Sequence, residues 1–186
     1  NFHLDYGKLP EVLSTEVSRQ LGTNLEVEVV RTHLFGSYAW NYDLRDDEAA
    51  QRQRDFFSML KEKYHYEVEV FPLDFRGRRL RRADRKPDDT FEPKEKCVDI
   101  ALAGSIMYYA AIPNAYDIAL VVVGDKDYVP VLQYVRRLGK RVAIASIQNC
   151  CCPEYSDPYD EARVKDFDIV WLDDQLERLE LTFKKH

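Results

Sequence analysis

The sequence predicts an α/β fold, a single three-layer α/β/α domain around a mostly parallel sheet. The first observation is an unbroken aliphatic run at residues 118–123 that ends at Gly124, as is typical of a strand buried on both faces of a parallel sheet. The second is that strand-like and helix-like segments alternate, which requires crossover connections and places helices on both faces of the sheet. At 186 residues the chain suits one domain with a sizeable core.

Hydrophobic period and end signals define the individual elements. Helical spacing predicts helices over residues 9–21, 49–64, 95–111, 128–138, 160–165 and 173–181. Alternating or continuous apolar character predicts strands over residues 26–35, 66–75, 118–123, 141–147 and 169–172. The helix at 95–111 is apolar nearly all round, which predicts that it is buried. The loops after residues 35, 75, 123 and 147 should all leave the carboxyl edge of the sheet.

Composition narrows the class of protein. The net charge of −6 excludes a surface that is basic all over, so contact with nucleic acid must be local. No apolar run approaches the length of a membrane span. The four cysteines, three of them adjacent at residues 150–152, form neither a disulfide framework nor a zinc spacing. We therefore expect a reduced, cytoplasmic protein without a metal role for these cysteines.

Two carboxylates, Asp125 and Asp127, follow the central strand directly. Acids at positions i and i+2 on a loop at the carboxyl edge can share a hard cation. The same residues can also cap the helix that follows. Lys126 between them either neutralises a phosphate or is simply solvated.

Two other segments carry residues suited to RNA. Between residues 76 and 86, seven of eleven residues are basic and only Asp84 opposes them, so residues 76–93 are expected to be a basic flexible loop. Its arginines are candidates for phosphate contact, with solvation as the alternative; those proposed are Arg76, Arg78, Arg79, Arg81 and Arg82. Tyr38, Trp40 and Tyr42 follow a predicted strand, and they either stack on unpaired bases or pack partly against the protein.

Three further segments resemble one known family. They are Lys96-Cys-Val-Asp-Ile-Ala-Leu-Ala103, then Ile118-Ala-Leu-Val-Val-Val-Gly-Asp-Lys-Asp-Tyr-Val-Pro-Val131, then Arg137-Leu-Gly-Lys-Arg-Val142. In this order they resemble the NYN domain of the LabA-like branch, which is similar to PIN-domain nucleases. The usual forms in that family are K-G-V-D-V-A-L-A, S-G-D-S-D-F-V-P-L and L-G-K-x-V. The motifs cover the second half of the chain, whereas the first half matches only in its order of elements.

The resemblance implies a PIN-like, Rossmann-like fold and a ribonuclease that depends on Mg²⁺ or Mn²⁺. Asp99, Asp125 and Asp127 match the acids that hold the metal. The family opens with a strand that ends D-x-x-N; Asn1 stands where that asparagine would be, so we expect the first strand upstream of residue 1. Relatives often carry a second acid six residues after the helical aspartate, where this chain has Ser105. Because Asp99 lies among apolar residues, burial without a partner would be costly, which favours a metal role over a helix-end acid.

Three functions follow as hypotheses. The first is a metal-dependent ribonuclease that uses Asp99, Asp125 and Asp127, with Asn1, Ser105 and Lys126 in support and single-stranded RNA as substrate. The second is an NYN module that binds RNA in a regulatory role and has lost turnover, which Ser105 motivates. The third is a small-molecule phosphohydrolase, because G-D-x-D also resembles the late acidic motif of haloacid-dehalogenase-like enzymes. A homodimer is compatible with the sequence, whereas a membrane partner is not expected.

Overall fold

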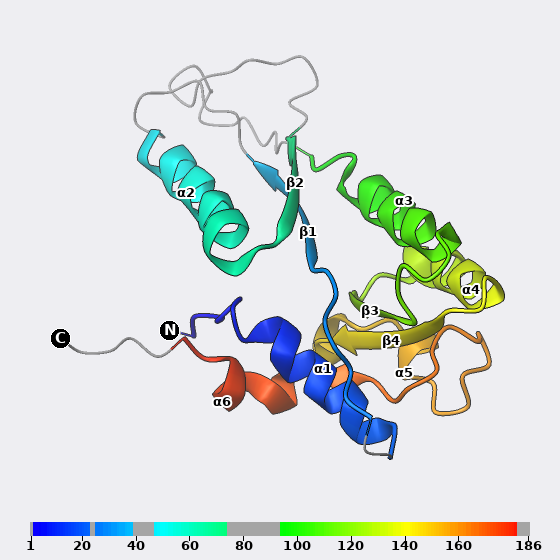
Figure 1. Ribbon diagram of the computed structural model, residues 1–186. Coiled ribbons are helices and arrows are strands. Elements are labelled where there is room, and N and C mark those ends of the chain that lie inside the picture. The colour runs from blue at the N-terminus through cyan, green and yellow to red at the C-terminus, as the bar shows by residue number, and fades with distance from the viewer. Residues whose placement is uncertain (1, 23–24, 39–46, 74–93, 182–186) are drawn as a thin grey trace. The chain divides into compact units, whose positions relative to one another are not determined.

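The computed structural model describes residues 2–22, 25–38, 47–73 and 94–181. The chain divides into two compact units (Figure 1). Unit 1 contains residues 1–30 and 103–186, and unit 2 contains residues 31–102. The strands within each unit are parallel, which confirms the predicted α/β class.

The sheet of unit 1 is formed by the strand predicted to be central and the two strands that follow it. Among these three strands the predicted central strand lies at one end, and its Val122 is 47% exposed. Its order is β3 (Ile118–Val122), β4 (Arg141–Ser146) and β5 (Val170–Trp171), all parallel. Helix α4 (Val129–Arg137) is the crossover from β3 to β4. Because strands joined in this way are parallel, the loops after β3 and β4 leave the same carboxyl edge.

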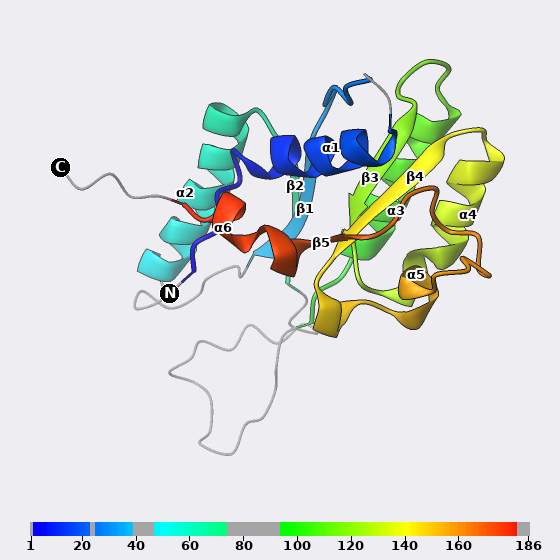
Figure 2. The same ribbon diagram turned by 90° about the horizontal axis from the view of Figure 1, so that it is seen from below.

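Strand β4 lies in the middle of three layers, which explains its continuous apolar sequence. Ala143 and Ala145 are fully buried and belong to a cluster with Leu13 of α1 (Leu9–Gln20). Val142 and Ile144 point to the opposite face of the strand, where α4 packs against β4. Figure 2 shows α1 and α4 on opposite sides of β4. Unit 1 therefore has the predicted helix–sheet–helix arrangement.

The two ends of the described chain pair with each other in unit 1. The Asp5 amide donates to the Leu179 carbonyl, and the Leu181 amide donates to the His3 carbonyl, each at 2.8 Å. These bonds follow two short elements, the 3₁₀ helix η5 (Leu172–Gln175) and helix α6 (Leu176–Leu179). The single predicted helix over residues 173–181 is therefore divided, and its last residues are extended.

Unit 2 is a β-α-β crossover. Strand β1 (His33–Tyr38) pairs in parallel with β2 (Glu67–Pro72), and α2 (Asp47–Tyr64) connects them. Helix α2 packs closely on this sheet, because a Cβ added to Gly36 would lie 3.3 Å from the Phe57 ring. The predicted strand over residues 26–35 was placed too early. Pairing with β2 begins only at His33. Val30, which precedes the paired residues, is 71% exposed.

Helix α3 (Val98–Ala111) begins three residues later than predicted. Cys97 has φ +74°, a left-handed conformation that a right-handed helix does not contain. The prediction that this helix is buried all round is also wrong. Ile100 is 78% exposed and Tyr108 is 64% exposed.

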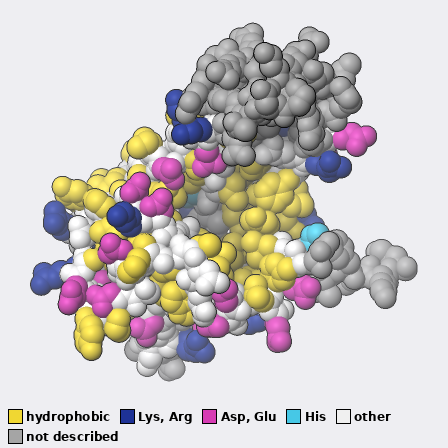
Figure 3. All heavy atoms as spheres, turned by 180° about the vertical axis from the view of Figure 1, so that it is seen from behind, with side chains coloured by type: hydrophobic (Ala, Val, Ile, Leu, Met, Phe, Trp, Pro, Cys, Tyr) yellow, Lys and Arg dark blue, Asp and Glu magenta, His cyan; other side chains and the backbone are white. Residues whose placement is uncertain are grey.

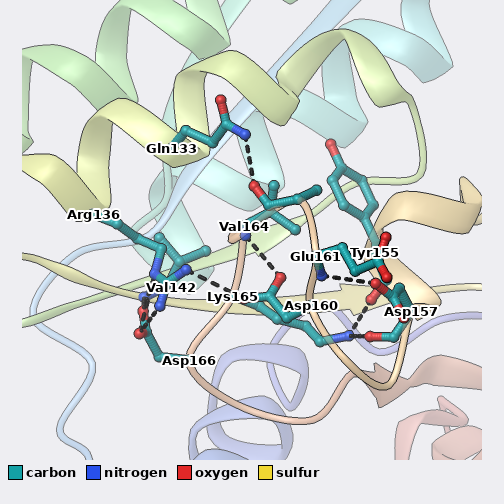
Figure 4. Close-up of polar contacts among 11 residues, drawn as sticks. Gln133, Arg136, Val142, Tyr155, Asp157, Asp160, Glu161, Val164, Lys165 and Asp166 are labelled. Atoms are coloured by element: carbon teal, nitrogen blue, oxygen red, sulfur yellow. Dashed lines mark hydrogen bonds and ion pairs between the residues drawn. The ribbon is translucent and has the colours of Figure 1, made fainter.

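Residues 160–165 do not form the predicted helix. Asp160 and Arg163 have φ +46° and +53°, and two left-handed residues three positions apart exclude a regular right-handed helix. Contacts with α4 hold this segment instead (Figure 4): Gln133 Nε2 donates to the Ala162 carbonyl at 2.6 Å, and Arg136 binds Asp160 at 3.2 Å. The short helix in this part of the chain is α5 (Pro153–Ser156).

Candidate metal site at the carboxyl edge

The loop that follows β3 is built on a glycine. A Cβ placed on Gly124 would overlap the carbonyl oxygen of Cys150, so the backbone of the next crossover occupies the space that any other side chain would need. The Cys152 amide also donates to the Gly124 carbonyl at 2.8 Å. The acidic loop and the cysteine segment, defined as residues 150–152, therefore meet at one edge of the sheet, as the predicted topology requires.

Asp125 has a structural role in this loop. Its Oδ1 accepts a hydrogen bond of 3.0 Å from the Asp127 amide, which caps the 3₁₀ helix η3 (Lys126–Tyr128). Asp125 thus caps η3, whereas the longer helix α4 that follows has no side-chain cap at Tyr128. One oxygen is used in this way, whereas Asp125 Oδ2 and the Asp127 carboxylate have no hydrogen-bond partner among the described residues. Both side chains are exposed, as is Lys126.

The buried side chain of Tyr155 supports the same loop. The Tyr155 hydroxyl donates to the Asp125 carbonyl at 2.6 Å, and the Tyr155 side chain is fully buried. Burial raises the pKa of this hydroxyl. Burial likewise raises the pKa of the neighbouring Cys152 thiol, so this cysteine stays protonated rather than acting as a thiolate ligand.

The remaining predicted site residues have different settings. Asp99 lies in the first turn of α3 and is exposed, so the burial cost that favoured a metal partner for it does not arise. It belongs to unit 2, whereas Asp125 and Asp127 belong to unit 1; their convergence stays a prediction. Ser105 is half-buried in α3, and Tyr38 is the half-buried last residue of β1. The others lie outside the described residues: Asn1, Trp40, Tyr42, Arg76, Arg78, Arg79, Arg81 and Arg82.

The donor set of the loop is suited to a hard cation. Magnesium in proteins is bound through one or two carboxylates and keeps several waters, and the loop supplies two exposed carboxylates. Within residues 2–22, 25–38, 47–73 and 94–181, no three or more His, Cys, Asp or Glu side chains are grouped so that they could hold one metal ion. Asp125 and Asp127 would therefore bind an ion that keeps several of its water ligands.

Sequence reasoning did not find the residues that support the loop. Tyr155, Cys150 and Cys152 act through backbone contacts and burial, and no motif marks such contacts. Asp173 was also missed; its Oδ2 accepts from the Gln148 amide at 2.9 Å and so holds the turn after β4. A signal was available for α5, because Pro153 stands at its first position, where proline is favoured.

Parallel strands joined by helices, with a carboxylate pair directly after β3, define an α/β module of the PIN-like, nuclease type. The NYN domain family matches residues 3–157, most of the chain, and the protein belongs to that family. No curated protein and no solved structure matches the chain. None of the helices in the described ranges has the length and apolar character of a membrane span.

Proposed function

We propose that the protein is a LabA-like NYN ribonuclease that hydrolyses single-stranded RNA with Mg²⁺ or Mn²⁺ at Asp125 and Asp127, completed by Asp99. The observation that carries this proposal is the exposed carboxylate pair on a tightly held loop at the carboxyl edge of β3. NYN and PIN-like nucleases generally depend on a divalent metal, and NYN domains usually bind RNA.

The loop residues have separate tasks in this reaction. A divalent ion supplies Lewis acidity and activates water for attack on a phosphodiester. Asp127 and Asp125 Oδ2 would hold that ion, while Asp125 Oδ1 keeps its bond to the Asp127 amide and so fixes the geometry of the pair. Lys126, exposed between them, carries a positive charge that favours binding of the phosphate. Asn1 and Ser105 are proposed to orient ligands of the ion.

RNA affinity is assigned to the basic loop and to the aromatic residues Tyr38 and Trp40. The chain as a whole carries a charge of −6. On the face drawn in Figure 3, acidic and basic side chains of the described residues are interspersed. A concentrated run of arginine is therefore the strongest local source of phosphate attraction in the sequence, and aromatic rings add stacking that tolerates any base.

A matched pair of substitutions tests the proposal. Asp125→Asn should abolish cleavage of a fluorescent single-stranded RNA in Mn²⁺ or Mg²⁺ and weaken Mn²⁺ binding. Asp117→Asn removes the same charge from an exposed residue at the other end of β3 and should leave both unchanged. RNA binding measured with Ca²⁺ in place of the active metal should survive Asp125→Asn.

Two results would contradict the assignment. Equal loss of cleavage in Asp125→Asn and Asp117→Asn would show that cleavage depends on the overall charge of the protein rather than on the acidic loop. A parent protein that binds RNA but never cleaves it in either metal would favour the regulatory module instead.

A further inference from the structure

We propose that Tyr155 is a positioning residue for the acidic loop, because its hydroxyl fixes the backbone from which the Asp125 and Asp127 carboxylates project. This inference rests on the proposed function in one respect only, namely that the loop holds a metal. The position of the loop itself is set by contacts among described residues of unit 1.

Tyr155 is itself held firmly. Its side chain is fully buried, and its amide donates to the Cys152 carbonyl at 3.1 Å. Lys165 Nζ donates to the Tyr155 carbonyl and, at 2.8 Å, to the Asp157 carbonyl (Figure 4). A buried side chain anchored at both its amide and its carbonyl presents its hydroxyl at a defined point.

The Tyr155 hydroxyl and the nearby Cys152 amide bind two carbonyls of the acidic loop. The Asp125 carbonyl accepts from the Tyr155 hydroxyl at 2.6 Å, and the Gly124 carbonyl accepts from the Cys152 amide at 2.8 Å. Two successive main-chain carbonyls are thus bound by one segment, residues 152–155. Rotation of the peptide between Gly124 and Asp125 would break the bond to Cys152, and rotation of the peptide between Asp125 and Lys126 would break the bond to Tyr155.

The consequence for the site is geometric. Both carboxylates extend from the backbone of residues 125–127, and Asp125 Oδ1 is already bound to the Asp127 amide. A shift of the Asp125 peptide moves the two ligands together, and small misplacements of ligand groups lower both metal affinity and rate. Tyr155 thus acts through Asp125, without touching the metal or the substrate.

The test uses Tyr155→Phe, which removes one oxygen and keeps the buried ring. The matched control is Tyr116→Phe at the amino end of β3. The Tyr116 hydroxyl is buried and has no hydrogen-bond partner among the described residues. Two quantities are measured in the full chain: amide hydrogen exchange at residues 124–128, and Mn²⁺ affinity by titration calorimetry. Thermal unfolding of both variants separates these quantities from a general loss of stability.

In Tyr155→Phe, exchange at residues 124–128 should accelerate and Mn²⁺ binding should weaken, each by about two- to tenfold, the range expected for one hydrogen bond. Tyr116→Phe should change neither. Parental exchange in Tyr155→Phe overturns the proposal, as does parental Mn²⁺ affinity in a parent protein that binds Mn²⁺. If the parent binds no Mn²⁺, the proposed metal function fails, and the exchange rates alone decide whether Tyr155 positions the loop.

Discussion

Asp166 holds the guanidinium of Arg136 with both carboxylate oxygens. Arg136 Nη2 donates to Asp166 Oδ1 at 2.7 Å, and Arg136 Nε lies 3.1 Å from each oxygen. Asp166 Oδ2 also accepts from the Val142 amide at 2.8 Å. One carboxylate therefore joins the end of α4 to the start of β4 and to the segment that follows α5.

Removal of this carboxylate should destabilise the protein. Asp166→Ala leaves a partly buried arginine and the Val142 amide without this partner, which should lower the free energy of unfolding by about 2–4 kcal/mol. Asp168→Ala is the control, because its side chain is exposed and only its main chain bonds to Gln20; its effect should stay within about 0.5 kcal/mol. Urea unfolding measures both, and equal midpoints for parent and Asp166→Ala would refute this role.

Gly124 should tolerate no side chain. In Gly124→Ala the new Cβ overlaps the Cys150 carbonyl oxygen, so one backbone must move, at a cost of about 1–3 kcal/mol in unfolding free energy. Gly104→Ala is the matched control, since a Cβ there meets nothing within 4 Å. Gly104 lies within α3, and alanine there should stabilise by roughly 0.5–1 kcal/mol. The two substitutions should change the free energy of unfolding, measured with urea, in opposite directions. An unchanged value for Gly124→Ala would show that the backbones at Gly124 and Cys150 can separate at little cost.

His33 should make stability depend on pH. Burial lowers the pKa of His33, against the raising effect of Glu67 and Glu69, while Arg31 adds to the lowering. The unfolded state therefore binds a proton more readily than the folded state. The contribution of His33 is fully present above about pH 6.5, the ordinary value, and is lost as pH falls through the lower folded pKa.

The measurement is urea unfolding between pH 7.5 and pH 5. His33→Phe keeps a ring that can stack on Phe35, as the imidazole does with centroids 6.1 Å apart. This variant should lose less stability than the parent over that range. If the free energy of unfolding falls with pH as steeply in His33→Phe as in the parent, His33 is not a source of the pH dependence.

The basic loop should govern the salt dependence of RNA binding. For a single strand, each phosphate neutralised contributes about −0.7 to the slope of log affinity against log salt. Replacement of four arginines by alanine, at Arg78, Arg79, Arg81 and Arg82, should flatten that slope and weaken binding to all sequences alike. The same four changed to lysine keep the charge and should keep the slope. A parental slope in the alanine variant would exclude this loop as the phosphate contact.

The sequence predicted the segment from β3 to β4 more accurately than the segments on either side of it. β3, α4 and β4 were placed within two residues of their ends, because both strands are continuous aliphatic runs and Gly139, with φ +83°, ends the helical segment. The strand in unit 2 was extended too far because valine alternation at residues 27–30 continues before β2 offers a partner. Local pattern does not reveal where a partner strand begins.

The candidate site shows the same division between local and tertiary information. The G-D-x-D pattern identified Asp125 and Asp127 as loop acids, since a strand-to-helix turn is visible in sequence. The support from Tyr155 depends on a hydrogen bond between residues 30 positions apart, and residues 160–165 failed as a helix because Asp160 and Arg163 take left-handed conformations. Both features depend on tertiary packing, which the spacing of apolar residues along the sequence does not reveal.

The ion pair between Glu16 and Arg178 has a consequence for the order of events during synthesis. These residues are 162 positions apart, and Arg178 Nη1 lies 2.6 Å from Glu16 Oε1. The residues of β4 and β5 that pack against α1 are also synthesised late. At 5–20 residues per second, translation of that interval takes roughly 10–30 s. Until β4 and β5 have been made, the apolar face of α1 lacks the strands that cover it in unit 1, so we expect this helix to remain exposed on the nascent chain for most of that time.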